Sequence, residues 1–137
     1  MDRPALQAWL DRYVEAWKSY DPDAIGALFG EDATYRYHPY DADDQVIRGR
    51  DAIVRDWIVP DGNASTRDEP DSYDAHYEPY AIDGDRAVAA GSSRYWTDGT
   101  RSQLQATFDN VYLLRFDDDG RCVEFSEYFM KRPDPAG

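Results

Sequence analysis

The chain has 137 residues, of which 42% are hydrophobic and 15% aromatic, which is enough for one domain with a core of its own. Its formal net charge of -13 at pH 7 argues against nucleic acid and anionic membranes as partners, because both would repel it. The one cysteine, Cys122, excludes an internal disulfide, and together with an N-terminus that has no apolar signal core it predicts a cytoplasmic location.

The first helix is predicted between Pro4 and Tyr20. Its apolar side chains recur every three or four residues and therefore share one face. They are Leu6, Trp9, Leu10, Tyr13, Val14 and Trp17. Asp21 can cap a second helix that has Pro22 in its first position. We expect that helix to bury Ile25, Leu28 and Phe29 and to end at Gly30.

A short strand, rich in Tyr and Thr, is predicted from Ala33 to His38, where Pro39 stops it. An acidic loop over residues 41–44 follows. A third helix is expected from about Arg50 to Ile58. The stretch from Pro60 to Ser72 combines Gly, Asn, Ser and Pro with several charges, which predicts a mobile loop.

From Tyr73 onward the hydrophobic period changes to two, which predicts four strands over residues 73–82, 86–97, 102–116 and 121–130. Asp-Gly pairs in the turns between them are strong hairpin signals. Strands of this length favour a strongly bent antiparallel sheet. Three helices followed by a meander are an α+β order, so we expect one domain with its core at about residues 4–132, a short C-terminal tail, and a hollow on the concave side of the sheet.

Short motifs spread over residues 6–132 carry a family resemblance. They are Tyr13-Val14-Glu15-Ala16-Trp17, Asp21-Pro22-Asp23-Ala24-Ile25, Leu28-Phe29, Asp32-Ala33, Gly49-Arg50-Asp51-Ala52-Ile53, Trp57, Arg115-Phe116, Asp119-Gly120-Arg121 and Glu127-Tyr128-Phe129. Through them the chain resembles the SnoaL-like branch of the nuclear transport factor two-like superfamily, which includes isomerases, dehydratases, cyclases, epoxide hydrolases and members with no known activity. The resemblance implies a cone of three N-terminal helices on a curved antiparallel sheet, a pocket for a small organic molecule, and a homodimer built on the sheet.

The resemblance also assigns roles to individual positions. The first-helix tyrosine of ketosteroid isomerase, which donates a hydrogen bond to the developing oxyanion, falls on Tyr13. The general-base aspartate of that enzyme falls on or beside His38, and its second oxyanion donor, an aspartic acid, falls on Tyr112. The chain keeps the tyrosine and lacks both carboxylic acids, which argues against steroid-type isomerase chemistry.

His38 and Glu127 are the candidates for proton transfer, with Tyr13 as the third candidate catalytic residue. An imidazole moves protons near neutral pH, although a histidine before Pro39 can also be purely structural. Glu127 shares a strand face with Phe125 and Phe129, and a carboxylate on an interior face must be paired or protonated. Glu127 would then orient His38, act as a base itself, or pair with a buried Arg or Tyr.

Strand alternation separates the residues of the third long strand into two sets. If Asn110 and Tyr112 face the interior, they offer polar contacts in an apolar pocket, while Val111 and Leu113 face outward together with Tyr128. The expected ligand-binding residues are Trp17, Tyr37, Trp57, Asn110, Tyr112, Phe125 and Phe129.

Two functions of different classes remain open. The first is a cofactor-free lyase, isomerase or hydrolase that acts on a small apolar, polyketide-like or steroid-like compound by acid-base chemistry, with Tyr13 or Tyr112 stabilising charge. The second is a non-catalytic ligand-binding or dimerisation module of the same fold. No metal or cofactor is expected, because the two histidines and one cysteine have no zinc-type spacing and no Gly-rich phosphate loop follows a strand.

Overall fold

The computed structural model describes residues 1–59 and 68–136. Residues 60–67 of the expected loop 60–72, and Gly137 at the end of the tail, lie outside the described residues. None of the described helices is long and apolar enough to cross a membrane.

The first helix, α1, spans Arg3–Ser19, as predicted. The side chain of Asp2 accepts a hydrogen bond from the backbone N–H of Ala5 at 2.9 Å, which satisfies one of the unpaired donors at the helix start. At the other end Tyr20 adopts a left-handed conformation with φ 53° and closes the helix. The predicted apolar face is buried except for Trp17, which is partly buried.

The second helix, α2, is shorter than predicted. It spans Pro22–Gly26, and the chain then enters strand β1, Phe29–Arg36, so Leu28 and Phe29 do not belong to the helix. The carbonyl of Leu28 accepts hydrogen bonds from the Cys122 backbone N–H at 2.9 Å and from the Trp9 indole at 3.0 Å. Pairing with a distant strand therefore removes these residues from the helix that local sequence favours.

The segment between β1 and the third helix contains two elements that the sequence did not predict. A single 3-10 turn, η1 (Asp43–Gln45), lies in the acidic loop, and β2 (Ile47–Arg48) pairs antiparallel with β1. A strand of two residues carries no detectable period. The third helix, α3, spans Arg50–Ile58 as predicted.

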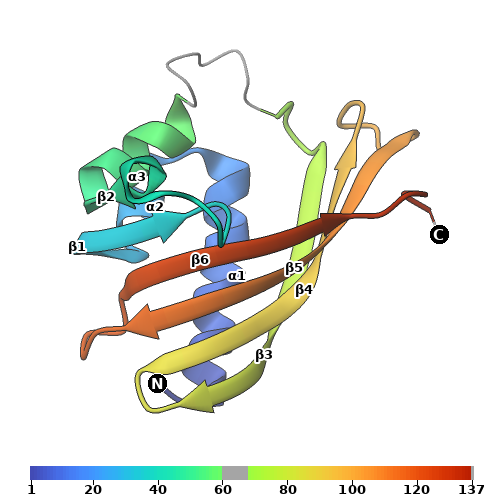
Figure 1. Ribbon diagram of the computed structural model, residues 1–137. Coiled ribbons are helices and arrows are strands. Elements are labelled where there is room, and N and C mark those ends of the chain that lie inside the picture. The colour runs from blue at the N-terminus through green and yellow to red at the C-terminus, as the bar shows by residue number, and fades with distance from the viewer. Residues whose placement is uncertain (60–67, 137) are drawn as a thin grey trace.

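The four long strands are β3 (Tyr73–Asp83), β4 (Arg86–Trp96), β5 (Leu104–Phe116) and β6 (Cys122–Lys131), and they form the predicted antiparallel meander. The complete sheet has six strands in the order β2-β1-β6-β5-β4-β3. Strand β1 pairs parallel with β6, which the sequence did not predict. Figure 1 shows the curved, unclosed sheet with α1 crossing behind it and α2 and α3 beside β1.

The orientation of β5 agrees with the predicted alternation. Asn110 and Tyr112 are 5% and 2% exposed, whereas Val111 and Leu113 are 38% and 42% exposed. Because successive side chains of a strand point to opposite faces, the inner face of β5 is the one that meets the helices. The core between helices and sheet is dominated by aromatic side chains, and this packing positions the site.

Candidate functional site

An inner aromatic cluster fills the centre of the cone. It consists of Tyr13 of α1, Tyr35 of β1, Tyr77 of β3, Tyr112 of β5 and Phe125 of β6. The rings of Tyr13 and Phe125 are stacked with centroids 5.4 Å apart, and those of Tyr35 and Phe125 are stacked at 4.3 Å. Five different elements thus converge on one point, as the cone fold requires.

The hydroxyl groups of this cluster are partnered within the protein. The Tyr13 and Tyr35 hydroxyls form a hydrogen bond of 3.1 Å, and the Nδ2 amide of Asn110 donates to the Tyr77 hydroxyl at 3.0 Å. Burial raises the pKa of Tyr13 well above its ordinary value, and the negative charge of Glu127 raises it further. The tyrosines therefore remain neutral and can donate hydrogen bonds at any physiological pH.

Beside this cluster lies a small cavity, which we call the Glu127 cavity. Its volume is about 180 Å³, and its lining residues are Ser93, Tyr95, Phe108, Asn110, Glu127 and Phe129. The lining comes from the inner faces of β4, β5 and β6. Two predicted ligand-binding residues, Asn110 and Phe129, thus meet one predicted catalytic residue, Glu127.

The Glu127 carboxyl is the titratable group of this cavity. Burial raises its pKa from an ordinary value of 4.5 to about 7. Within the part of the chain that the structure describes, no group donates a hydrogen bond to it. The negative charge of Glu127 raises the pKa of one tyrosine on each of α1, β1, β3, β4 and β5. These are Tyr13, Tyr35, Tyr77, Tyr95 and Tyr112. The carboxyl is therefore close to half ionised near neutral pH.

Three further predicted ligand-binding residues, Trp17, Tyr37 and Trp57, do not belong to the Glu127 cavity. The rings of Trp17 and Trp57 lie 4.1 Å apart, and Trp17 also contacts Tyr13 edge to face at 6.3 Å, one turn away on α1. The hydroxyl of Tyr37 donates to Asp56 at 2.9 Å. These side chains border the inner aromatic cluster and do not line the Glu127 cavity.

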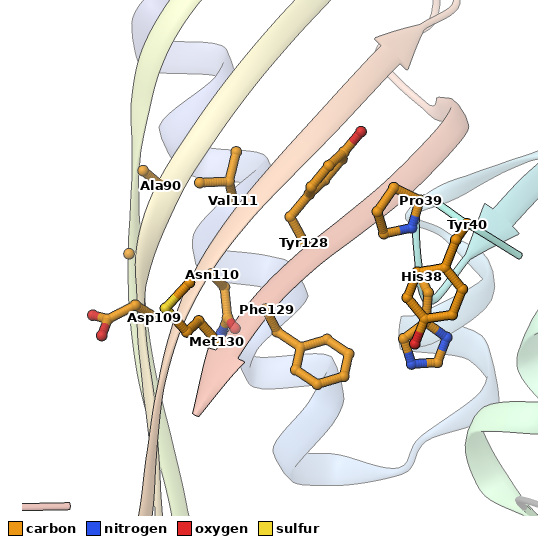
Figure 2. Close-up of a pocket in the computed structure, with 11 residues that line it drawn as sticks. His38, Pro39, Tyr40, Ala90, Asp109, Asn110, Val111, Tyr128, Phe129 and Met130 are labelled. Carbon is orange, nitrogen blue, oxygen red and sulfur yellow. The ribbon is translucent and has the colours of Figure 1, made fainter. Parts of the chain in front are cut away.

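A hollow larger than the Glu127 cavity lies outside the cone. It is an apolar groove of about 710 Å³ between the segment that follows β1 and strands β4, β5 and β6, and we call it the outer groove. Figure 2 shows His38, Pro39 and Tyr40 facing Tyr128 and Phe129 across it. Asn110 and Phe129 line both the outer groove and the Glu127 cavity.

His38 lies in the outer groove, and the structure does not bring it into a hydrogen bond with Glu127. Its Nδ1 atom is 3.0 Å from a carboxylate oxygen of Asp41, and its backbone N–H donates to the other oxygen at 3.1 Å. Its ring stacks on Tyr40 at 5.0 Å and lies 5.3 Å from Phe129. The predicted meeting of His38 with Tyr13, Tyr112 and Glu127 in one cavity is therefore not present in this structure.

Sequence reasoning did not single out three of the lining residues, namely Ser93, Tyr95 and Phe108. Side chains alternate along β4, and Ala87, Ala89 and Ser93 lie on its buried face. Tyr95 is two residues after Ser93 and therefore shares this face, so the alternation could have identified it. Of the small residues on this stretch, Ser93 lines the cavity. For metals, the described ranges contain no group of three or more His, Cys, Asp or Glu side chains placed to hold an ion.

Comparison with known proteins agrees with the fold. A family model described as a SnoaL-like domain matches residues 10–125. Among curated proteins, no sequence matches the chain. Among solved structures, an M. tuberculosis LEH-like epoxide hydrolase is similar, with a TM-score of 0.60 and 15% sequence identity over 93% of this chain and 84% of that chain. At this identity the likeness concerns the fold alone, which is the nuclear transport factor two-like cone.

Proposed function

The chain belongs to the SnoaL-like domain family, and we propose that it binds a small, largely apolar molecule in the Glu127 cavity and exchanges a proton with it through Glu127. The observation that carries the proposal is a carboxyl group with a pKa of about 7 in the wall of an apolar cavity, with no hydrogen-bond donor from the described residues. A carboxyl in this condition is free to interact with a ligand.

Acid-base catalysis is most effective when the pKa of the catalytic group is close to the working pH. Glu127 meets this requirement without a metal or a second acid, so the reaction class that fits is a cofactor-free proton transfer, as in a lyase, an isomerase or a hydrolase. Tyr95 is the tyrosine that lines the cavity, so it is the one that would support charge that develops on a ligand. Tyr13 does not line the cavity, and its hydroxyl is bonded to that of Tyr35.

The size of the cavity supports a small ligand. Pockets for drug-sized molecules have volumes of about 300–1,000 Å³. At about 180 Å³ the Glu127 cavity is smaller, which favours a compound with a single ring over a polyketide-like or steroid-like compound. The aromatic walls of Tyr95, Phe108 and Phe129 suit a flat or cyclic body.

A specific observation favours a second candidate, a non-catalytic binding module. The inner aromatic cluster occupies the centre of the cone, and His38 is bonded to Asp41 rather than to Glu127. A single carboxyl then recognises a ligand without a partner to complete a proton relay. In that case the protein holds a small molecule and releases it unchanged.

The two candidates are separated by one comparison of three proteins: wild type, Glu127→Gln and Glu124→Gln. Glu124 lies on the same strand and faces the opposite side, so its variant is a matched control. Compounds that raise the melting temperature of the wild type in a metabolite screen are then tested for turnover. Catalysis is supported if the wild type turns a compound over, Glu127→Gln lowers the rate at least about 100-fold, and Glu124→Gln leaves it unchanged. Binding without turnover supports the module. Both candidates are contradicted if Glu127→Gln binds the compounds as tightly as the wild type does.

A further inference from the structure

The side-chain amide of Asn110 makes two hydrogen bonds through its nitrogen. Its Nδ2 atom donates to the Tyr77 hydroxyl at 3.0 Å and to the Ser93 hydroxyl at 3.1 Å, and the side chain is 5% exposed. Both donors of the amide are therefore used toward β3 and β4. Since the two arms of a planar amide diverge, the carbonyl oxygen Oδ1 points away from these strands, and Phe129 of β6 is its neighbour across the sheet.

This carbonyl oxygen has no partner. In the described residues only two buried polar side-chain atoms lack a hydrogen bond, and Asn110 Oδ1 is one of them. An unsatisfied buried acceptor costs about 1–3 kcal/mol. Native proteins keep such atoms rarely, and a ligand that supplies the missing donor is one explanation for them.

Two oxygen acceptors of the cavity, Asn110 Oδ1 and the Glu127 carboxyl, are suited to a cation. The Glu127 carboxyl is a second acceptor without a donor from the described residues, and it lines the same cavity as Asn110. Tyr95, Phe108 and Phe129 also line the cavity, and the face of an aromatic ring attracts an organic cation. The net charge of -13 draws cations toward the whole molecule.

We infer that the ligand of the Glu127 cavity is a small organic amine in its ammonium form, which donates hydrogen bonds to Asn110 Oδ1 and to the Glu127 carboxylate while its apolar body lies between Phe108 and Phe129. This inference rests on the proposed function, in that it names the ligand of the same cavity. Of the aromatic wall residues, Phe129 is the exposed one, with 46% exposure. Because Asn110 Oδ1 is fully buried, a ligand reaches it only if a neighbouring side chain moves, and Phe129 is its exposed neighbour across the sheet.

Amine binding has a distinctive pH dependence. Glu127 is protonated in part near neutral pH, and an ammonium ion binds its ionised form, so affinity rises as the pH increases from 6 to 8. The groups that face Glu127 from α1, β1, β3, β4 and β5 are tyrosines, which do not ionise in this range. A neutral ligand that accepts a proton from Glu127 shows the opposite trend.

The test uses three probes of similar shape: benzylamine, benzyl alcohol and toluene. Isothermal titration calorimetry gives the affinities at pH 6, 7 and 8, and ¹⁵N NMR shows whether the signals of Ser93, Asn110 and Glu127 move. We expect benzylamine to bind at least about 10-fold more tightly than benzyl alcohol at pH 8, and its affinity to rise with pH. Glu127→Gln and Asn110→Leu should each weaken benzylamine by about 10-fold or more, while Glu124→Gln has no effect.

Each other outcome overturns the inference in a distinguishable way. If benzyl alcohol or toluene binds in the cavity as tightly as benzylamine, the amine assignment is wrong and the proposed function stands. If none of the probes moves the NMR signals of Ser93, Asn110 and Glu127, the amine assignment and the proposed function both fail. Asn110→Asp keeps an acceptor at the same place and should retain amine binding. If Asn110→Asp loses amine binding although its NMR spectrum shows a fold like that of the wild type, Asn110 acts through its donors. That outcome would refute its proposed role as an acceptor.

Discussion

The hydroxyl groups of Tyr13 and Tyr35 lie 3.1 Å apart in the buried centre of the cone, so each is the hydrogen-bond partner of the other. The resemblance seen in the sequence implies that Tyr13 donates a hydrogen bond to a ligand, whereas in this structure its hydroxyl is bonded to that of Tyr35 in β1. The pair joins α1 to the sheet through a polar contact inside an aromatic core.

Replacing Tyr35 with phenylalanine tests the strength of this contact. The variant loses one buried hydrogen bond and keeps the ring stacked on Phe125, so we expect the free energy of unfolding to fall by about 1 kcal/mol. Urea unfolding followed by fluorescence measures the change. Tyr80→Phe is the control, because the Tyr80 side chain is 76% exposed and its hydroxyl faces water. Equal stability of the two variants would mean that the pair contributes nothing.

Glu127 should make stability depend on pH in an unusual direction. Its pKa in the folded protein, about 7, is above its ordinary value of 4.5, so the folded state binds the proton more tightly than the unfolded chain does. The resulting stabilisation is complete below pH 4.5 and is lost as the pH rises through 7. We therefore expect Glu127→Gln to be more stable than wild type at pH 8, by on the order of 1–3 kcal/mol, and no more stable at pH 4.5. Melting temperatures of the wild type and Glu127→Gln across this pH range, with Glu124→Gln as control, measure the effect. If the carboxyl were solvated, the difference between the two melting temperatures would not change with pH.

The role of His38 can be decided with His38→Ala. The imidazole is bonded to Asp41 and lies in the outer groove, so its removal should change probe affinity in the Glu127 cavity by no more than about twofold. Calorimetric titration of wild type and variant with the same probe gives the ratio. A loss comparable to that of Glu127→Gln would support the hypothesis from sequence that His38 and Glu127 act together.

The outer face of the sheet predicts a homodimer. Val111, Leu113, Tyr128 and Met130 are 38%, 42%, 42% and 73% exposed there, and Figure 2 shows Val111 and Tyr128 side by side on neighbouring strands. Apolar side chains gathered on a sheet face indicate a surface that a partner covers. Light scattering at micromolar concentration should give a mass near twice 15.7 kDa. The double variant Val111→Lys, Leu113→Lys should be monomeric, and Ala27→Lys on the far side should not; a monomeric wild type would refute the dimer.

Local patterns in the sequence were sufficient for most of the fold. The period of α1 and the alternation of β3 to β6 arise from burial of one face, so they are readable without tertiary information. The end of α2 could not be predicted from local patterns, because Leu28 and Phe29 pair with Cys122, which is distant in sequence. Strand β2 was missed because two residues have no period.

The candidate site was predictable where it depends on strand alternation and unpredictable where it depends on a turn. Asn110, Glu127 and Phe129 follow from counting by two along β5 and β6. His38 lies just after β1, and Asp41 accepts from both its backbone and its ring. The spacing of three between a histidine and an aspartate across Pro39 is the local signal of these hydrogen bonds, and the imidazole that makes them lies in the outer groove.

The parallel pairing of β1 with β6 has a consequence for how the protein is made. Thr34 pairs with Glu124, so the strand that anchors β2 and α3 finds its neighbour only after nearly the whole chain has left the ribosome. Contacts between such distant segments must overcome a large loss of chain entropy before they form, which slows folding. Until then β1 pairs only with the two residues of β2, while α1 can already pack against β3. We therefore expect a chain that stops before β6 to leave the aromatic side chain of Tyr35 without its partner Phe125 and to be prone to aggregation.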